Sequence, residues 1–176
     1  MSKIYGLAER LYTQTLPICV GELATGINYS GGGVVHVIGA SPNWVLTTDD
    51  TNSFDQATKT YTCPLEGSYE VAIVVMPDSG FTLQIFLMIE ITNPDGTPFR
   101  EFPLEYSRDA YHRGGYLLTP NLLKGSTIRL LLVIPTSGNP LFRGQTTVTG
   151  YTRSHNWFSI KYDPRNRVDR QIKYRC

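Results

Sequence analysis

The sequence predicts an all-β fold, a two-sheet antiparallel jelly-roll sandwich. Sixteen glycines, eleven prolines and eleven tyrosines accompany only 18% charged residues, a balance that favours strands and loops over long charged helices. Apolar segments alternate with turn residues, and counting these segments gives about eight to ten strands. Their lengths do not repeat, which fits a jelly roll better than a regular barrel or propeller. At 176 residues, we expect one domain.

The N-terminal residues 1–33 are expected to form an arm, with a short helix around residues 7–12. The arm ends in a run of three glycines at 31–33, which precedes β signals and lacks the strand-to-helix context of a nucleotide-binding loop. It is therefore interpreted as a linker. The opening residues lack the apolar core of a secretory signal, and no run reaches the roughly 18 apolar residues that cross a bilayer. We expect no membrane insertion.

The jelly-roll domain is predicted to span residues 34–163, followed by a basic tail at 164–176. Its strands are expected at 34–38, 44–47, 69–75, 81–91, 99–104, 127–135, 145–151 and 157–162. In the strand 69–75, one face carries the larger apolar side chains, and the other becomes apolar only towards its end. The apolar run 81–91 is too long to classify by periodicity. It is assigned as a strand because turn residues bound it, and the turn at 93–96 predicts a hairpin.

A tight connection is expected between residues 63 and 67. Pro64 removes a backbone donor, and Gly67 can adopt the positive φ that a sharp turn needs. Around this turn the chain resembles the front half of the globular head of complement C1q, in which an aromatic-Asp-x-x-Thr loop precedes an aromatic-x-Cys-x-x-x-Gly-x-Tyr run. The matching residues are Phe54, Asp55, Thr58, Tyr61, Cys63, Gly67 and Tyr69.

The back half carries a second resemblance to this family. Leu123, Gly125 and Ile128 match the entry into a late core strand, and the aromatic strand at 157–160 is similar to the closing strand of C1q heads. Ile160 stands where that pattern has glycine. The resemblance covers roughly residues 34–162, and we interpret the chain as a viral or phage member of this family. It implies a C1q/TNF-like jelly roll that assembles as a homotrimer around a threefold axis.

No catalytic constellation is recognised. His36, His112 and His155 lie in separate contexts, and none has a nucleophile or carboxylate at motif spacing. We expect no catalytic residue, no bound cofactor apart from a calcium ion, and no enzymatic activity. A hydrolase remains an alternative, because triad residues meet in space rather than in sequence.

The candidate metal ligands are Asp49, Asp50 and Asp55, which cluster in one loop. Calcium prefers carboxylate and carbonyl oxygens, and the resembling family sometimes holds calcium near its trimer apex. The spacing is not that of an EF-hand, and loop aspartates also cap turns, so both interpretations stay open.

Three cysteines, Cys19, Cys63 and Cys176, cannot all pair within one chain and show no metal-binding spacing. Cys63 is expected to be a small buried apolar residue beside the turn. For the terminal Cys176, an intermolecular disulfide is an alternative. The pairing and redox state of the three are left open.

The tail from residue 161 onward is the one local charge anomaly, with six basic and two acidic residues, so six minus two gives +4. The candidate docking residues are Arg165, Arg167, Arg170, Lys173 and Arg175. They form either an element that docks on an acidic protein or nucleic acid, or a solvated terminus. The whole chain carries only +1, so we expect no nucleic-acid binding except through this tail.

We interpret the chain as a non-enzymatic homotrimeric structural or binding module, a virion protein such as a capsid subunit, spike head or decoration protein. Three features favour this interpretation: the absence of a secretory signal, the absence of a collagen-like Gly-x-y stalk, and extensions at both ends. Its partners are then further copies of itself, other virion proteins or a surface receptor. The alternative is a soluble, extracellular C1q/TNF-like recognition or signalling ligand.

Overall fold

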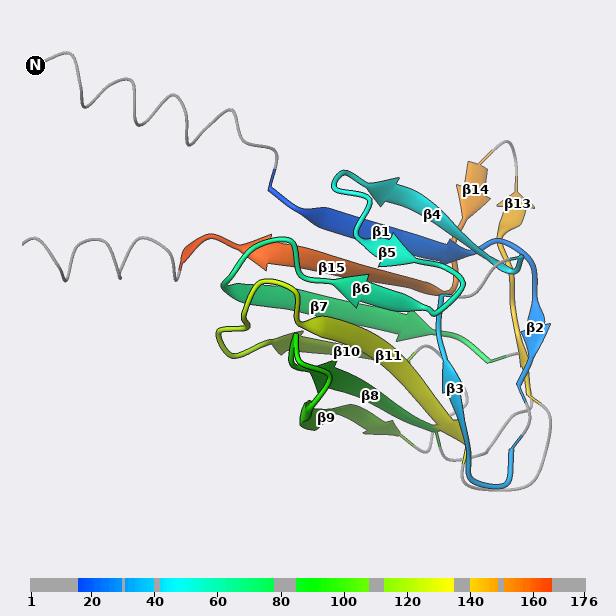
Figure 1. The fold of residues 1–176 in the computed structure, drawn as a ribbon. Coiled ribbons are helices and arrows are strands. Elements are labelled where there is room, and N and C mark those ends of the chain that lie inside the picture. The colour runs from blue at the N-terminus through cyan, green and yellow to red at the C-terminus, as the bar shows by residue number, and fades with distance from the viewer. Residues whose placement is uncertain are drawn as a thin grey trace, which may run out of the picture.

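The computed structural model describes residues 16–29, 31–39, 42–77, 85–107, 113–134, 140–148 and 151–165. Two antiparallel sheets form a jelly-roll sandwich, as predicted (Figure 1). The first sheet contains, in order, β10 (Arg113–Leu118), β7 (Ser68–Val75), β15 (Trp157–Asp163), β1 (Ile18–Leu23) and β4 (Trp44–Asp49). The second contains β5 (Phe54–Asp55), β6 (Thr60–Thr62), β11 (Thr127–Ile134), β8 (Ile85–Thr92) and β9 (Pro98–Ser107), with β3 (Val34–Val37) paired to β11.

Two small ribbons complete the described strands. One pairs β2 (Ile27–Asn28) with β12 (Leu141–Phe142), and the other pairs β13 (Thr146–Val148) with β14 (Tyr151–Arg153). The strand predicted at 145–151 is therefore two short strands, with residues 149–150 outside the described part. The strand predicted at 81–91 is β8, which starts at Ile85, and residues 81–84 also lie outside the described part.

The start of the domain differs from the prediction. Residues 18–23, assigned to the arm, form β1 in the interior of the first sheet, between β15 and β4. The strand alternates in burial, with Cys19 and Leu23 fully buried. Gly21 concealed this pattern, because it is a weak strand former whose place on the inner face is filled by the ring of Phe158. The helix expected at 7–12 lies outside the described residues.

Strand β10 was also missed. No strand was predicted at residues 113–118, where Gly114 and Gly115 interrupt the apolar pattern. It nevertheless pairs with β7 over six residues, from Arg113 opposite Val75 to Leu118 opposite Glu70. β10 forms because β7 pairs with it along its whole length. It is an edge strand of the first sheet.

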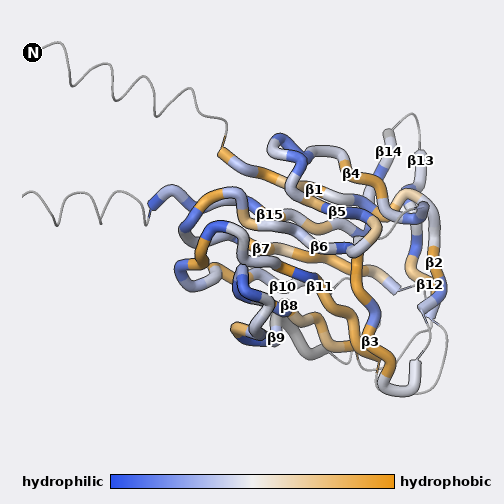
Figure 2. The backbone as a smooth tube through the Cα atoms, viewed as in Figure 1, coloured by the Kyte–Doolittle hydropathy of each residue, from blue (hydrophilic) through white to orange (hydrophobic). Residues whose placement is uncertain are grey.

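The core lies between the sheets and contains two aromatic groups. Phe158 packs between Trp44 and Phe54, with ring centroids 5.7 and 5.3 Å away. The three tyrosines Tyr61, Tyr69 and Tyr162 form a chain of edge contacts with centroids 5.9 and 5.5 Å apart. Each aromatic group joins strands of both sheets, so side chains from distant parts of the sequence hold the sandwich together. Figure 2 shows the hydrophobic stretches that run along the strands.

The residues of the C1q-like stretch have identifiable physical roles. The turn before β7 brings Gly67 against Tyr162, where φ is +150° and a Cβ would lie 2.6 Å from the ring. Tyr69 locks the same turn, because its hydroxyl donates to the Leu65 carbonyl at 2.7 Å and accepts from the Leu65 amide at 3.1 Å. Cys63 is fully buried beside it, as predicted. The stretch therefore specifies how the chain enters β7.

Candidate functional site

The outer face of the first sheet, which points away from the core, is the candidate functional site. The strand register places Tyr116, Ala72, Ser159 and Val20 in one row across four strands. Tyr116 is 59% exposed, the largest exposed fraction among the exposed large hydrophobic residues of the described part. Ala72 is small, so the tyrosine ring stands at the edge of a shallow apolar surface.

A second row runs parallel to the first. It joins Val74 on β7, Trp157 on β15, Glu22 on β1 and Val45 on β4. Val45 is 46% exposed, and the other three are half-buried. A carboxylate thus lies among apolar side chains, where it accepts hydrogen bonds from Ser154 and from Gln145, the latter at 2.7 Å. The Glu22 carboxylate is therefore already hydrogen-bonded, and the other three side chains of the row are apolar.

The third row is charged. It places Leu118, 41% exposed, beside Glu70 and Lys161. Arg165 follows the end of β15 and turns back over this row, with its guanidinium 3.0 Å from Glu70 and 2.8 Å from Asp163. The Arg165 guanidinium lowers the pKa of the buried Asp163 carboxyl by hydrogen bonding, and Asp163 in turn raises the pKa of Arg165. One end of the outer face is therefore bounded by an ion-pair network.

The arrangement suits contact with another protein. An antiparallel sheet that faces water normally alternates apolar inward and polar outward side chains. Here two of the three rows are apolar on the outward side as well. The second face of β7, which becomes apolar towards the end of the strand, is this outward face, and within the described part of the chain no sheet or helix covers it. Exposed apolar surface of this kind marks interaction sites.

Two of the three predicted calcium ligands, Asp49 and Asp55, accept turn hydrogen bonds, whereas the third, Asp50, is exposed. The two carboxylate oxygens of Asp49 accept the amides of Ser53 and Phe54 at 2.9 and 3.0 Å. Those of Asp55 accept the Ala57 amide and the Thr58 hydroxyl, both at 2.8 Å, and these bonds lower the pKa of Asp55. No group of three or more His, Cys, Asp or Glu side chains suited to a metal occurs among the described residues. This geometry supports the turn-capping alternative, and calcium binding stays a prediction.

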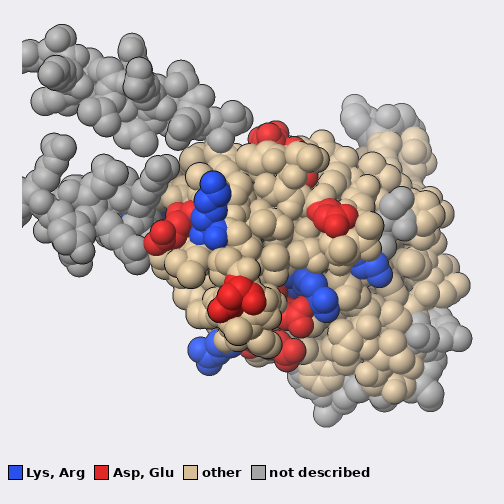
Figure 3. Space-filling model, in the orientation of Figure 1, with Lys and Arg blue, Asp and Glu red and all other residues tan. Residues whose placement is uncertain are grey.

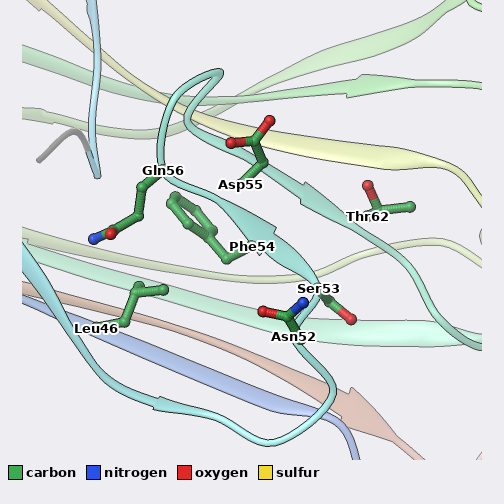
Figure 4. Close-up of a pocket in the computed structure, with 7 residues that line it drawn as sticks. All are labelled: Leu46, Asn52, Ser53, Phe54, Asp55, Gln56 and Thr62. Carbon is green, nitrogen blue, oxygen red and sulfur yellow. The ribbon is translucent and has the colours of Figure 1, made fainter.

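A recess beside the same loop is lined by Leu46, Asn52, Ser53, Phe54, Asp55, Gln56 and Thr62. Figure 4 shows the Phe54 ring beside Gln56, with Leu46 below them. Gln56 is held by the Trp44 carbonyl at 3.3 Å. Both Asp55 oxygens already accept hydrogen bonds, so the recess offers no unengaged charged group for chemistry.

The histidines are not brought together. His36 on β3 stacks against Tyr29 at 4.8 Å, whereas His155 hydrogen-bonds Thr146 at 2.8 Å on the small β13–β14 ribbon. His112 lies outside the described residues. His36 and His155 therefore lie in different parts of the fold.

Two of the three cysteines are buried free thiols. Burial raises the pKa of Cys63 to about 12, and burial followed by the nearby Asp49 charge raises that of Cys19 to about 12. Both are therefore neutral at physiological pH. Cys176 lies outside the described residues, as do Arg167, Arg170, Lys173 and Arg175 of the predicted docking tail.

Sequence reasoning missed the outer face. Tyr116 and Leu118 lie on the unpredicted β10, and Val20 and Glu22 lie in the supposed arm. Two features of the sequence could have indicated this face. Gly114, Tyr116 and Leu118 are alternate residues of one segment, and the second face of the 69–75 strand becomes apolar. Within the described part of the chain, no helix has the length and apolar character to span a membrane.

Comparisons with known proteins identify the fold. No family model and no curated protein matches the sequence. Among solved structures, the globular domain of zebrafish complement 1qA matches with a TM-score of 0.50 and 13% identity, covering 84% of this chain and 97% of that one. Eiger TNF from S. frugiperda matches at 0.51 and 11%, covering 85% and 94%, and murine APRIL matches at 0.50 and 10%, covering 85% and 100%. The chain therefore has the C1q/TNF-like jelly-roll fold.

Proposed function

We propose that the chain is a non-enzymatic module that assembles as a homotrimer through the outer face of the first sheet. The observation that carries this proposal is the apolar character of that face, with Tyr116, Leu118 and Val45 between 41 and 59% exposed. Tyrosine is enriched at the buried centres of protein interfaces, because its ring buries a large area and its hydroxyl tolerates a wet edge.

The size of the face supports an interface with a folded partner. Five strands spaced about 4.8 Å apart and three rows about 7 Å apart give roughly 24 by 20 Å, or ~480 Å² before side-chain relief. A stable interface buries about 800 Å² per partner, so this face supplies a large part of the required area. The resemblance to the C1q/TNF family implies three copies around an axis. A ring closes when one surface of each copy meets a different surface of the next.

Within this assembly we propose the role of a virion structural protein: a capsid subunit, spike head or decoration protein. Its partners would be further copies, other virion proteins or a surface receptor. Support comes from the ends of the described chain: the Tyr162 amide donates to the Pro17 carbonyl at 2.9 Å, so β1 and β15, the first and last described strands, lie side by side there (Figure 1). Two adjacent chain ends suit a module anchored at that end.

A second candidate is an extracellular recognition or signalling ligand. The likeness to a complement domain and to a TNF favours it, although at 10–13% identity this likeness concerns the fold. The two candidates share the trimer and differ in location. Detection of the chain among the proteins of purified particles supports the virion role, and its secretion as a free trimer that binds a cell surface supports the ligand role.

The native mass tests the assembly. Light scattering after size exclusion should give a species near three times 19.7 kDa, or closed shells and arrays in electron micrographs of the same fractions. Tyr116→Lys should convert this species to a monomer, because it places a charge at the centre of an apolar contact. The matched control Thr62→Lys, at an exposed position on the second sheet, should not. A folded monomeric wild type would refute the proposal.

A further inference from the structure

The outer face of the second sheet is divided into a polar half and an apolar half. In the polar half, Arg129 on β11 pairs with Glu90 on β8 at 2.7 Å, and threonines occupy the next row. In the other direction along the same strands, the outward positions become apolar. We call this region the apolar half; its residues are Val35 and Val37 on β3, Leu131 and Val133 on β11, and Phe86 and Met88 on β8.

Figures 2 and 3 show the same division. The tube is hydrophobic along much of β3 and the adjoining parts of β11 and β8, and most of the space-filling surface over their lower part is free of Lys, Arg, Asp and Glu. Val35 is 52% exposed, whereas the other residues of the apolar half are half-buried or buried. Leu131, on the neighbouring β11, is only 4% exposed. The accessible part of the apolar half is therefore concentrated at β3.

One backbone edge of β3 has no partner strand within the described part of the chain. The Ile38 amide donates to the Leu130 carbonyl at 2.9 Å, and the register pairs Val37 with Leu131. In an antiparallel ladder the residues that exchange hydrogen bonds alternate with residues that do not. The N–H and C=O groups of Val35 and Val37 therefore point away from β11. Among the described residues, no strand pairs with β3 on that side.

The size of the apolar half indicates what can cover it. Three strands about 4.8 Å apart and two rows about 7 Å apart span roughly 14 by 14 Å, or ~200 Å². That is about a quarter of the ~800 Å² per partner that a stable interface between folded proteins buries. A second folded copy is therefore a poor match. A single extended segment, about 5 Å wide with side chains alternating between two faces, fits the dimensions.

We propose that β3 accepts an added strand from a partner protein, an uncharged segment in which apolar side chains alternate with small polar ones. The backbone of this segment would pair with the free N–H and C=O groups of Val35 and Val37. Its apolar side chains would extend the row that begins with Val35 and Val133. This mode takes its affinity from main-chain hydrogen bonds and its specificity from alternate side chains. An exposed edge with apolar side chains invites such pairing.

Amide hydrogen exchange tests the open edge in the unliganded protein. The Val35 and Val37 amides should exchange much faster than those of His36 and Ile38, which face β11. Equal protection of all four would overturn the proposal. Protection of Val35 and Val37 that rises with protein concentration would also overturn it, because a second copy would then be the occupant.

Binding is tested with a fluorescent nine-residue peptide, acetylated and amidated, in which threonine and valine alternate. The proposal predicts saturable anisotropy and slower exchange of the Val35 and Val37 amides when the peptide is bound. A peptide with two central prolines should bind at least tenfold more weakly. No binding of the alternating peptide up to millimolar concentration, or equal binding of the two peptides, would overturn the proposal.

Substitutions locate the binding edge. Val37→Pro removes one N–H from the open edge and leaves the β11 ladder complete, because proline is tolerated at a strand edge. It should weaken peptide binding at least tenfold without changing the native mass, so it separates this inference from the proposed trimer. Val35→Lys, at a half-exposed site, should have the same effect and serves if Val37→Pro does not fold. The matched control Thr92→Lys, in the polar half, should change binding less than twofold; loss there and not at β3 would overturn the proposal.

Discussion

Substitution of Gly21 by alanine tests whether β1 belongs to the jelly roll. An alanine Cβ at this position would collide with the ring of Phe158, which is fully buried between Trp44 and Phe54. The ring cannot move freely, because aromatic side chains hold it on both sides. If residues 1–33 were a dispensable arm, the same substitution would change stability by less than about 0.5 kcal/mol.

The structure allows the expected magnitude to be estimated. Overpacking a core costs about 1–3 kcal/mol, and replacing glycine within a strand recovers about 0.5–1 kcal/mol of backbone entropy. Gly21→Ala should therefore destabilise the protein by about 1–2 kcal/mol. Phe158→Leu alone should cost about 1–2 kcal/mol, since truncation to alanine costs about 3–5 kcal/mol and leucine retains much of the volume. The double variant should cost less than the sum, by about 1 kcal/mol, because leucine makes room for the new methyl group.

The assay is denaturant unfolding of the four proteins, with thermal melts as a second probe. At this chain length, 1 kcal/mol corresponds to about 2–4 °C in Tm. Two results would refute the reasoning. One is a Gly21→Ala variant as stable as the wild type, which would mean that β1 does not pack against Phe158. The other is strict additivity in the double variant, which would mean that the two positions are not in contact.

Three further predictions follow from the candidate-site geometry. Asp49→Ala should destabilise the protein by about 1–2 kcal/mol, because two turn amides lose their acceptor, and EDTA should leave the wild-type Tm unchanged; a calcium-dependent rise in Tm would instead support the metal site. The pKa of Asp163 is lowered by Arg165, so its stabilisation is present above the unfolded-state pKa of about 3.9 and is lost as pH falls through the lower folded-state value. Asp163→Asn should accordingly lower Tm at pH 7, and the difference from wild type should shrink below about pH 4 in melts across pH; a constant difference would contradict this assignment. Cys19 and Cys63, with pKa values raised to about 12, should react with a thiol reagent only after unfolding, so the count of reactive thiols should increase by two in denaturant; reaction of both in the native protein would show that they are not buried.

Sequence reasoning reached the central strands because their signals are local. The strand β7 alternates in burial from Tyr69 to Val75, and the turn before it carries Pro64 and Gly67, whose backbone restrictions can be read without a structure. The same is true of β8, β11 and β15, which are long and apolar. Short or glycine-containing strands such as β1 and β10 were missed, because their pairing partners rather than their own residues make them strands.

The candidate site shows the same limit more clearly. Asp49 and Asp55 were recognised as a cluster, but only the structure shows that backbone amides and a hydroxyl already occupy their oxygens. Tyr116 and Val45 are 71 residues apart in the sequence, and no spacing rule would connect them. They share a face only because β10 and β4 are opposite edges of one sheet.

The sequence by itself determined the all-β class, the central strands and the turn chemistry that leads into β7, because these depend on periodicity and on the backbone restrictions of single residues. The tertiary structure alone decided that β1 completes the first sheet and that an apolar row extends across its outer face. It also decided that, among the described residues, no strand pairs with the second edge of β3. The physical reason is that strand order and register depend on hydrogen bonds between distant segments, and a residue's own neighbours in sequence carry no information about which strand will lie beside it.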